Sequence, residues 1–175
     1  MPKKVKISVI GIGLMGLQHI KAIQRSKNTS LHSIVEIKKA GTELAKKIKV
    51  ALYKSTKILL ESDKPDAVVV ATPNILHETD TVQFLNSKIP VLLEKPISDN
   101  IKSAKKIISS AKKNKTSLLI GYHRRHNSIV NKVKKIIEGK VIIIVLNDKS
   151  ITFWVSFVSK YNQINASKDP IALVS

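Results

Sequence analysis

The sequence predicts an α/β fold built on a doubly wound parallel sheet. Short apolar runs alternate about six times with amphipathic stretches, which is the pattern of strands joined by helices. The segment "DAVVVATPN" (66–74) is apolar without alternation, as expected of a strand buried on both faces of a parallel sheet. A length of 175 residues suits one main domain with a sizeable core.

The first half of the chain contains three expected strands, at 5–10, 31–37 and 50–53. A helix is expected from Leu14, a second over 42–48 and a third over 55–61, because apolar residues there recur at helical spacing. The apolar stripe expected on the first of these helices consists of Leu14, Leu17, Ile20 and Ile23.

The second half continues the alternation. Strands are expected at 66–74, 90–96 and 116–122, and helices at 75–88, from Ile101 onward, and at 128–139. The helix that begins at Ile101 is amphipathic, with lysines outward and the following residues inward: Ile101, Ala104, Ile107, Ile108 and Ala111. Residues 140–158 resemble two consecutive strands, so a second sheet is expected to begin there.

Composition excludes several classes of protein. The chain has no cysteine, which removes disulfides, thiolate metal ligands and cysteine nucleophiles, and fits a cytoplasmic protein. No stretch approaches the roughly 18 consecutive apolar residues of a membrane helix. The five histidines show no spacing with carboxylates that indicates a metal site, so none is predicted.

The formal net charge is +19, and such a value is found in nucleic-acid-binding proteins. Here the basic residues are almost all lysines spread along the polar faces of expected helices. We interpret them as a solvated surface and expect no specific nucleic-acid partner, although attraction to anionic ligands follows from the charge.

A glycine motif follows the first expected strand. Gly11, Gly13 and Gly16 in "GIGLMG" have the G-x-G-x-x-G spacing, between a strand and a helix. In this motif the first glycine allows a tight turn, the second admits a pyrophosphate to the backbone, and the third lets helix and strand pack closely. The helix N-terminus then offers N–H groups to the phosphates.

An acidic residue is expected about 20 positions further on, and Glu36 lies twenty residues after Gly16. Its carboxylate would accept hydrogen bonds from the adenosine ribose and repel a 2′-phosphate, which favours NAD over NADP. Lys38 and Lys39 lie close by and leave NADP open as an alternative.

Two further segments end at the same predicted sheet edge, since ligands lie beyond the carboxyl ends of parallel strands. "ATPN" (71–74) would leave room for the cofactor through Ala71 and Thr72 and offer an amide through Asn74. "EKP" (94–96) places Lys95 where it could bind a substrate oxygen and assist proton transfer.

This order of motifs resembles the Gfo/Idh/MocA oxidoreductase family over roughly residues 5–139. The resemblance implies that Lys95 is the catalytic-site lysine, with Glu94 beside the nicotinamide ribose and Pro96 holding the turn. It also implies that Arg124 or Arg125 lines the cofactor–substrate cleft. The cofactor-binding residues expected on these grounds are Gly11, Ile12, Gly13, Leu14, Met15, Gly16, Glu36, Ala71, Thr72, Pro73, Asn74, His77, Glu94, Lys95, Pro96 and Arg124.

The family likeness implies hydride transfer between NAD and a hydroxyl or carbonyl carbon of a sugar, inositol or related polyol. We expect a dinucleotide-binding domain at 1–122 and, at 123–175, a connecting helix and the incomplete start of a substrate and oligomerisation domain. A second copy or a completing polypeptide is therefore an expected partner. His19 and His77 have counterparts in the family and are interpreted as structural. The alternative to an enzyme is a dinucleotide-binding remnant or sensor without catalysis.

Overall fold

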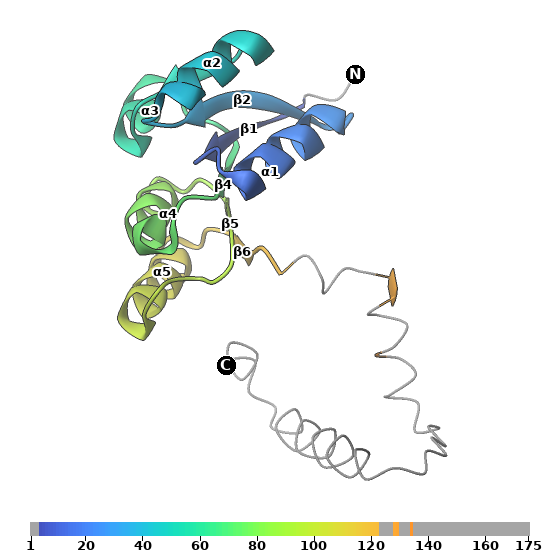
Figure 1. Cartoon of the computed structure of the whole chain (residues 1–175). Helices are drawn as coiled ribbons and strands as arrows, with labels where there is room; N and C mark the ends of the chain where they lie inside the picture. Colours follow the sequence, from blue (N-terminus) through green and yellow to red (C-terminus); the bar gives the residue numbers. More distant parts are fainter. Residues whose placement is uncertain (1–3, 123–127, 130–133, 135–175) are drawn as a thin grey trace, which may run out of the picture. The chain divides into compact units, whose positions relative to one another are not determined.

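The computed structural model describes residues 4–122, 128–129 and 134, and within it residues 4–122 fold around one sheet (Figure 1). Six strands, all parallel, lie in the order β3-β2-β1-β4-β5-β6. The strands are β1 (Val5–Ile10), β2 (Thr29–Val35), β3 (Ala51–Tyr53), β4 (Ala67–Val70), β5 (Val91–Leu93) and β6 (Leu118–Ile120). From β1 the chain adds β2 and β3 toward one edge of the sheet, and it then returns to the other side of β1 and adds β4, β5 and β6 toward the opposite edge. This order confirms the predicted doubly wound topology.

Five α-helices and one 3-10 helix connect these strands. They are α1 (Leu14–Arg25), α2 (Lys39–Ile48), α3 (Thr56–Ser62), the 3-10 helix η1 (Asn74–Leu76), α4 (His77–Asn86) and α5 (Ile101–Asn114). Each strand and helix expected up to residue 122 is present, with ends shifted by a few residues. The largest shift is in β4, which ends at Val70 instead of at residue 74.

Two hydrophobic cores lie on opposite faces of the sheet. Alternate residues of β1 and β4 divide between them, because successive side chains of a strand point to opposite faces. One core joins α1 and α2 to the sheet through Val9, Ile20, Ile23, Ile34, Ala45 and Val69. The other joins α3, α4 and α5 to it through residues that include Ile10, Leu59, Val70, Phe84, Leu93 and Ile107. This burial on both faces explains why β4 is apolar throughout.

Three residues expected in the core are instead exposed or half-exposed. Leu14 is 76% exposed, Leu17 37% and Ile101 75%. Leu14 and Ile101 are the first residues of α1 and α5, so they stand beyond the last strand residues, where no part of the sheet covers them. The helical period was right, but periodicity alone does not show where the sheet ends.

Beyond residue 122, Ser128, Ile129 and Lys134 are helical, within the helix expected at 128–139. The rest of that helix, the two strands expected at 140–158 and the candidate Arg124 lie outside the described residues. The division of the chain at residue 122 therefore stays a prediction.

Candidate functional site

The carboxyl ends of the parallel strands bring the predicted motifs to one edge of the sheet. The residue after each of four strands donates its backbone N–H to the last residue of the neighbouring strand. These bonds run from Gly11 to Val35 (2.9 Å), from Ala71 to Ile10 (2.8 Å), from Glu94 to Val70 (2.9 Å) and from Gly121 to Leu93 (2.7 Å). The glycine loop, "ATPN" and "EKP" therefore leave the sheet at neighbouring positions.

The glycine loop has the steric properties that its motif predicts. Gly11 has a φ of +85°, and a Cβ there would lie 2.8 Å from the carbonyl oxygen of Ala71. A Cβ on Gly16 would collide with the carbonyl oxygen of Gly11, so this glycine lets α1 pack onto the loop. Gly13 differs, because a Cβ there would meet nothing within 4 Å. The backbone at Gly13 faces open space on the side where a ligand would approach.

The N-terminus of α1 fits a dinucleotide phosphate. Gly13 is its N-cap and supplies no capping side chain, whereas α3 and α5 are capped by the side chains of Ser55 and Asn100. The first N–H groups of a helix have no intrahelical partner and carry a partial positive charge. Leu14, Met15 and Gly16 are the first three residues of α1, so their N–H groups would hold the pyrophosphate together with the glycine loop.

Glu36 follows β2 and lies beside the glycine loop, as the sequence predicts. Its Oε2 accepts a hydrogen bond from the backbone N–H of Ile12 at 3.3 Å, and its Oε1 accepts one from the N–H of Lys38 at 3.0 Å. The carboxylate is half-buried and held by backbone donors on two sides. It is thus fixed beside the glycine loop, where the sequence predicts the adenosine ribose to lie.

The "ATPN" loop is fixed by the helix that follows it. The Thr72 hydroxyl donates to Oδ2 of Asp80 in α4 at 2.9 Å. Burial raises the pKa of Asp80 above its ordinary value, although the Thr72 hydrogen bond and the nearby His77 both act to lower it. Pro73 and Asn74 are exposed beyond this anchor, so the Asn74 amide is accessible to a ligand.

The "EKP" corner is arranged so that one residue is buried and the next is exposed. The Glu94 side chain is only 7% exposed, and its Oε1 lies 2.6 Å from Nε2 of His19 in α1. Its Oε2 accepts a hydrogen bond from the backbone N–H of Lys95 at 3.2 Å. A Cβ on Gly121 would lie 3.1 Å from this carboxylate, so the glycine after β6 leaves it room. The Lys95 side chain is exposed at the ligand edge.

His77 connects the two loops. It is fully buried, with Nδ1 2.9 Å from the carbonyl oxygen of Pro96 and Nε2 2.9 Å from that of Thr72. The Lys95–Pro96 peptide is cis. His77 is thus held beneath the predicted cofactor residues and is not accessible to a ligand in this structure.

The described residues bring together all the predicted cofactor-binding positions except Arg124. Sequence reasoning missed three contributions: the support of Glu94 by His19, the space left for Glu94 by Gly121, and the hydrogen bond from Thr72 to Asp80. His19 lies three residues after Gly16, on the helix that opens with the glycine motif, and this placement was the available signal. No such signal marked Gly121 or Asp80.

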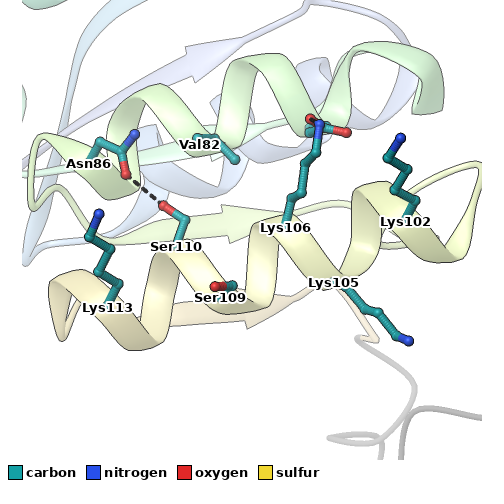
Figure 2. Close-up of a pocket in the computed structure, with 9 residues that line it drawn as sticks. Val82, Asn86, Lys102, Lys105, Lys106, Ser109, Ser110 and Lys113 are labelled. Carbon is teal, nitrogen blue, oxygen red and sulfur yellow. Dashed lines mark hydrogen bonds and ion pairs between the residues drawn. The ribbon is translucent and has the colours of Figure 1, made fainter.

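A depression lies away from these residues, between α4 and α5 (Figure 2). Lysines of α5 surround it, and the Lys106 Nζ lies 2.8 Å from Oε1 of Glu78 across it. This contact is the main reason that the pKa of Glu78 is lowered. Asn86 and Ser110 join its other end by a 2.8 Å hydrogen bond. None of the predicted cofactor residues lines this groove.

Residues 4–122, 128–129 and 134 contain no cluster of three or more His, Asp or Glu side chains arranged to hold a metal ion. The helices among those residues are also too short or too polar for any to cross a bilayer.

Comparison with known proteins points to one family. The sequence model described as "Oxidoreductase family, NAD-binding Rossmann fold" (Gfo/Idh/MocA) matches residues 5–122. An inositol 2-dehydrogenase of Corynebacterium glutamicum (strain R) is 30% identical over 143 residues, which are 79% of this chain and 42% of that protein. The chain thus spans about 42% of the length of this curated relative.

Solved structures agree with this assignment. An NAD-binding protein from Listeria innocua superposes with a TM-score of 0.72 at 27% identity, covering 80% of this chain and 42% of that one. Scyllo-inositol dehydrogenase from Lactobacillus casei, solved with NAD(H) and scyllo-inositol, has a TM-score of 0.74 at 22% identity and covers 78% of this chain and 42% of its own, a likeness that shows the fold. With the glycine loop and Glu36 at the same sheet edge, the chain belongs to the Gfo/Idh/MocA oxidoreductase family through its NAD-binding Rossmann domain.

Proposed function

We propose that the chain is the cofactor-binding part of a dehydrogenase that transfers a hydride between NAD and a hydroxyl-bearing carbon of a polyol. The observation that carries this proposal is the placement of Lys95. Its backbone N–H donates to the buried Glu94, and the carbonyl of the next residue, Pro96, contacts His77. Its side chain is exposed at the same edge of the sheet from which the glycine loop leaves. A lysine with a fixed backbone and a free ammonium suits contact with a substrate.

The cofactor residues would divide the dinucleotide between them. Glu36 would accept hydrogen bonds from the adenosine ribose, and the N-terminal N–H groups of α1 would hold the pyrophosphate. The loop at 71–74 and the corner at 94–96 would border the nicotinamide half. When bound, NAD supplies the hydride acceptor for this chemistry, which no side chain can provide.

Lys95 would act on the substrate oxygen. Oxidation of an alcohol requires loss of the hydroxyl proton as the hydride leaves the carbon. The ammonium of Lys95 would bind that oxygen, orient the carbon and stabilise the negative charge that develops on the oxygen, while the hydroxyl proton passes to solvent water. The inositol dehydrogenases among the relatives support a polyol as the substrate class. The absence of cysteine supports a cytoplasmic setting.

The test is an assay of NAD reduction by the natural full-length protein with myo-inositol, scyllo-inositol and free sugars as candidate substrates. We expect NADH formation with at least one polyol, and its loss when Lys95 is replaced by alanine. NAD binding without reduction by any polyol would support the alternative, a dinucleotide-binding module without catalysis. Failure of the folded protein to bind NAD would contradict both.

A further inference from the structure

Gly41 occupies a position in α2 where its presence needs a physical reason. It is the third residue of the helix and is buried, and glycine within a helix is less favourable than alanine by roughly 0.5–1 kcal/mol. Its backbone N–H donates to the carbonyl of Lys38 at 3.0 Å, an ordinary contact for the first turn of a helix. Local structure therefore does not explain the glycine.

The neighbouring side chain does explain it. A Cβ on Gly41 would lie 2.7 Å from Cβ and 2.8 Å from Cγ of Glu36. These atoms are the fixed stem of the glutamate and not its mobile end, so an added methyl group forces either the stem or the start of α2 to move. The third neighbour, Cδ1 of Leu52, would lie at 3.4 Å and closes the other side.

The carboxylate of Glu36 depends on where that stem lies. Its oxygens reach the N–H groups of Ile12 and Lys38 at 3.3 and 3.0 Å, so a small displacement of Cγ breaks one or both hydrogen bonds. A carboxylate in this position would accept from the ribose 2′-hydroxyl and repel a 2′-phosphate.

The surroundings of Glu36 are otherwise positive. Lys38 and Lys39 are exposed directly after it, and the Lys54 Nζ lies 3.4 Å from the carbonyl oxygens of both Glu36 and Ile37. These three lysines would attract the additional phosphate of NADP. The negative charge of Glu36 therefore opposes the attraction that these three lysines would exert on the 2′-phosphate of NADP.

We propose that Gly41 is a specificity-determining residue for the cofactor: because it lacks a Cβ, it admits the Glu36 side chain to the position from which it selects NAD against NADP. A side chain at position 41 displaces the carboxylate and leaves the lysines to favour NADP. The inference concerns cofactor choice only, so it stands or falls separately from the proposed polyol chemistry.

The experiment measures the dissociation constants of NAD and NADP by calorimetry for the wild-type chain and for Gly41→Ala. We expect the selectivity ratio, Kd for NADP over Kd for NAD, to fall at least about tenfold, the effect of losing roughly one good hydrogen-bonding group. The matched control is Ala40→Gly, which alters helix propensity in the same turn at an exposed position. Its ratio should stay within about twofold of wild type. A ratio for Gly41→Ala that equals the wild-type value overturns the proposal.

A double-mutant cycle tests whether Gly41 acts through Glu36. In a Glu36→Ala background the carboxylate is already absent, so adding Gly41→Ala should change the ratio by less than about twofold. An equally large further change in that background would show that Gly41 acts on the cofactor by another route, and the proposal would be wrong.

A second pair of variants covers the case in which circular dichroism shows Gly41→Ala to be unfolded. Lys38 has a φ of −72°, a value that proline adopts, so Lys38→Pro fits the backbone. It removes the N–H that donates a hydrogen bond to Oε1 of Glu36. Lys38→Ala removes the same charge but keeps the N–H. We expect a selectivity ratio at least about threefold lower in Lys38→Pro than in Lys38→Ala. Equal ratios would show that the held position of the carboxylate does not set selectivity.

Discussion

His19 holds Glu94: its Nε2 lies 2.6 Å from Oε1 of the glutamate, across 75 residues of sequence. The contact joins the helix that opens with the glycine loop to the corner that presents Lys95. The glycine loop and the corner at Lys95 are therefore connected through a buried carboxylate.

Replacing His19 should reveal how much this contact contributes. His19→Ala leaves a buried carboxylate oxygen without its partner, so we expect the free energy of unfolding to fall by about 1–3 kcal/mol. His19→Gln keeps a donor near the position of Nε2 and should recover part of the loss. Urea denaturation of the three proteins measures it.

The matched histidine is His32, whose Nε2 lies 3.1 Å from Oδ2 of Asp63. The Asp63 side chain is 57% exposed, so water replaces the lost partner and His32→Gln should cost less than about 1 kcal/mol. If His19→Ala were no more destabilising than His32→Gln, the His19–Glu94 contact would not be a support of the corner.

His77 offers a test of each loop in turn. Both partners of the His77 ring are carbonyl oxygens, those of Thr72 and Pro96, so a neutral imidazole with one N–H donates to only one of them. An asparagine amide lies near the position of Nδ1 and should serve Pro96, whereas a glutamine amide lies nearer Nε2 and should serve Thr72. His77→Leu serves neither and should lower the free energy of unfolding by more than about 2 kcal/mol.

The measurement is thermal unfolding together with NADH affinity for His77→Asn, His77→Gln and His77→Leu. We expect both amide variants to be more stable than His77→Leu. If all three unfold at the same temperature, neither carbonyl contact contributes to stability, and His77 does not join the loops energetically.

The sequence predicted more of this molecule than its composition suggests. Six strands and their helices followed from apolar runs and helical periods, because a parallel sheet buried on both faces leaves a strong signal in the chain. The glycine loop and Glu36 were located by spacing alone, since strand, turn and helix fix that spacing. Leu14 and Ile101 were placed wrongly in the core, because periodicity gives the face of a helix but not the extent of the sheet beneath it.

What the sequence did not show are contacts between residues far apart in the chain. Gly121 against Glu94 and Gly41 against Glu36 are steric relationships that depend on how elements pack. Thr72 and Asp80 are near in sequence, but a threonine and an aspartate eight residues apart carry no signal by themselves. Such pairs become visible only when the backbone is placed.

Lys95→Ala should separate binding from catalysis in the natural full-length protein. The ammonium would contact substrate and not the adenosine half of the cofactor, so turnover of the polyol should fall at least about a hundredfold while NAD affinity stays within a few fold. The exposed Lys102, in α5, provides the control, and Lys102→Ala should keep turnover. Undiminished turnover in Lys95→Ala would remove this residue from the mechanism.

Asp80 and Glu78 should give pH effects of opposite sign. Burial raises the pKa of Asp80 in the folded protein, so the ionised carboxylate opposes folding, and this penalty disappears as pH falls through the raised pKa toward the ordinary value of about 3.9. Asp80→Asn retains an acceptor for Thr72 and should be more stable than wild type at pH 7. The difference should shrink as the pH approaches 4.

The pKa of Glu78 is shifted in the opposite direction, so its effect on stability has the opposite sign. The hydrogen bond from Lys106 is the first cause of its lowered pKa, so the ionised form stabilises the fold, and that contribution is lost as pH falls below the ordinary value. Glu78→Gln should be less stable than wild type at pH 7 and equal to it in strong acid. Denaturant titrations at pH 7, 5 and 4 measure both variants, and the same sign for both would contradict these assignments.

Alanine substitutions at two glycines of the loop should have different effects, one on stability and the other on NAD affinity. Gly16→Ala places a methyl group on the carbonyl oxygen of Gly11, a backbone atom that cannot rotate away, so we expect severe loss of stability. Gly13→Ala meets nothing within 4 Å, and its φ of −61° suits alanine. Because alanine is a poorer N-cap than glycine, its stability should fall by no more than about 1 kcal/mol.

The same methyl group at position 13 would stand where the pyrophosphate approaches the start of α1. Gly13→Ala should therefore bind NAD at least about tenfold more weakly while remaining folded. Calorimetric titration with NAD, alongside thermal unfolding, measures both properties on one sample. Wild-type affinity in a folded Gly13→Ala variant would mean that the open space at Gly13 is not where the phosphates bind, and the cofactor would have to enter the sheet edge by another path.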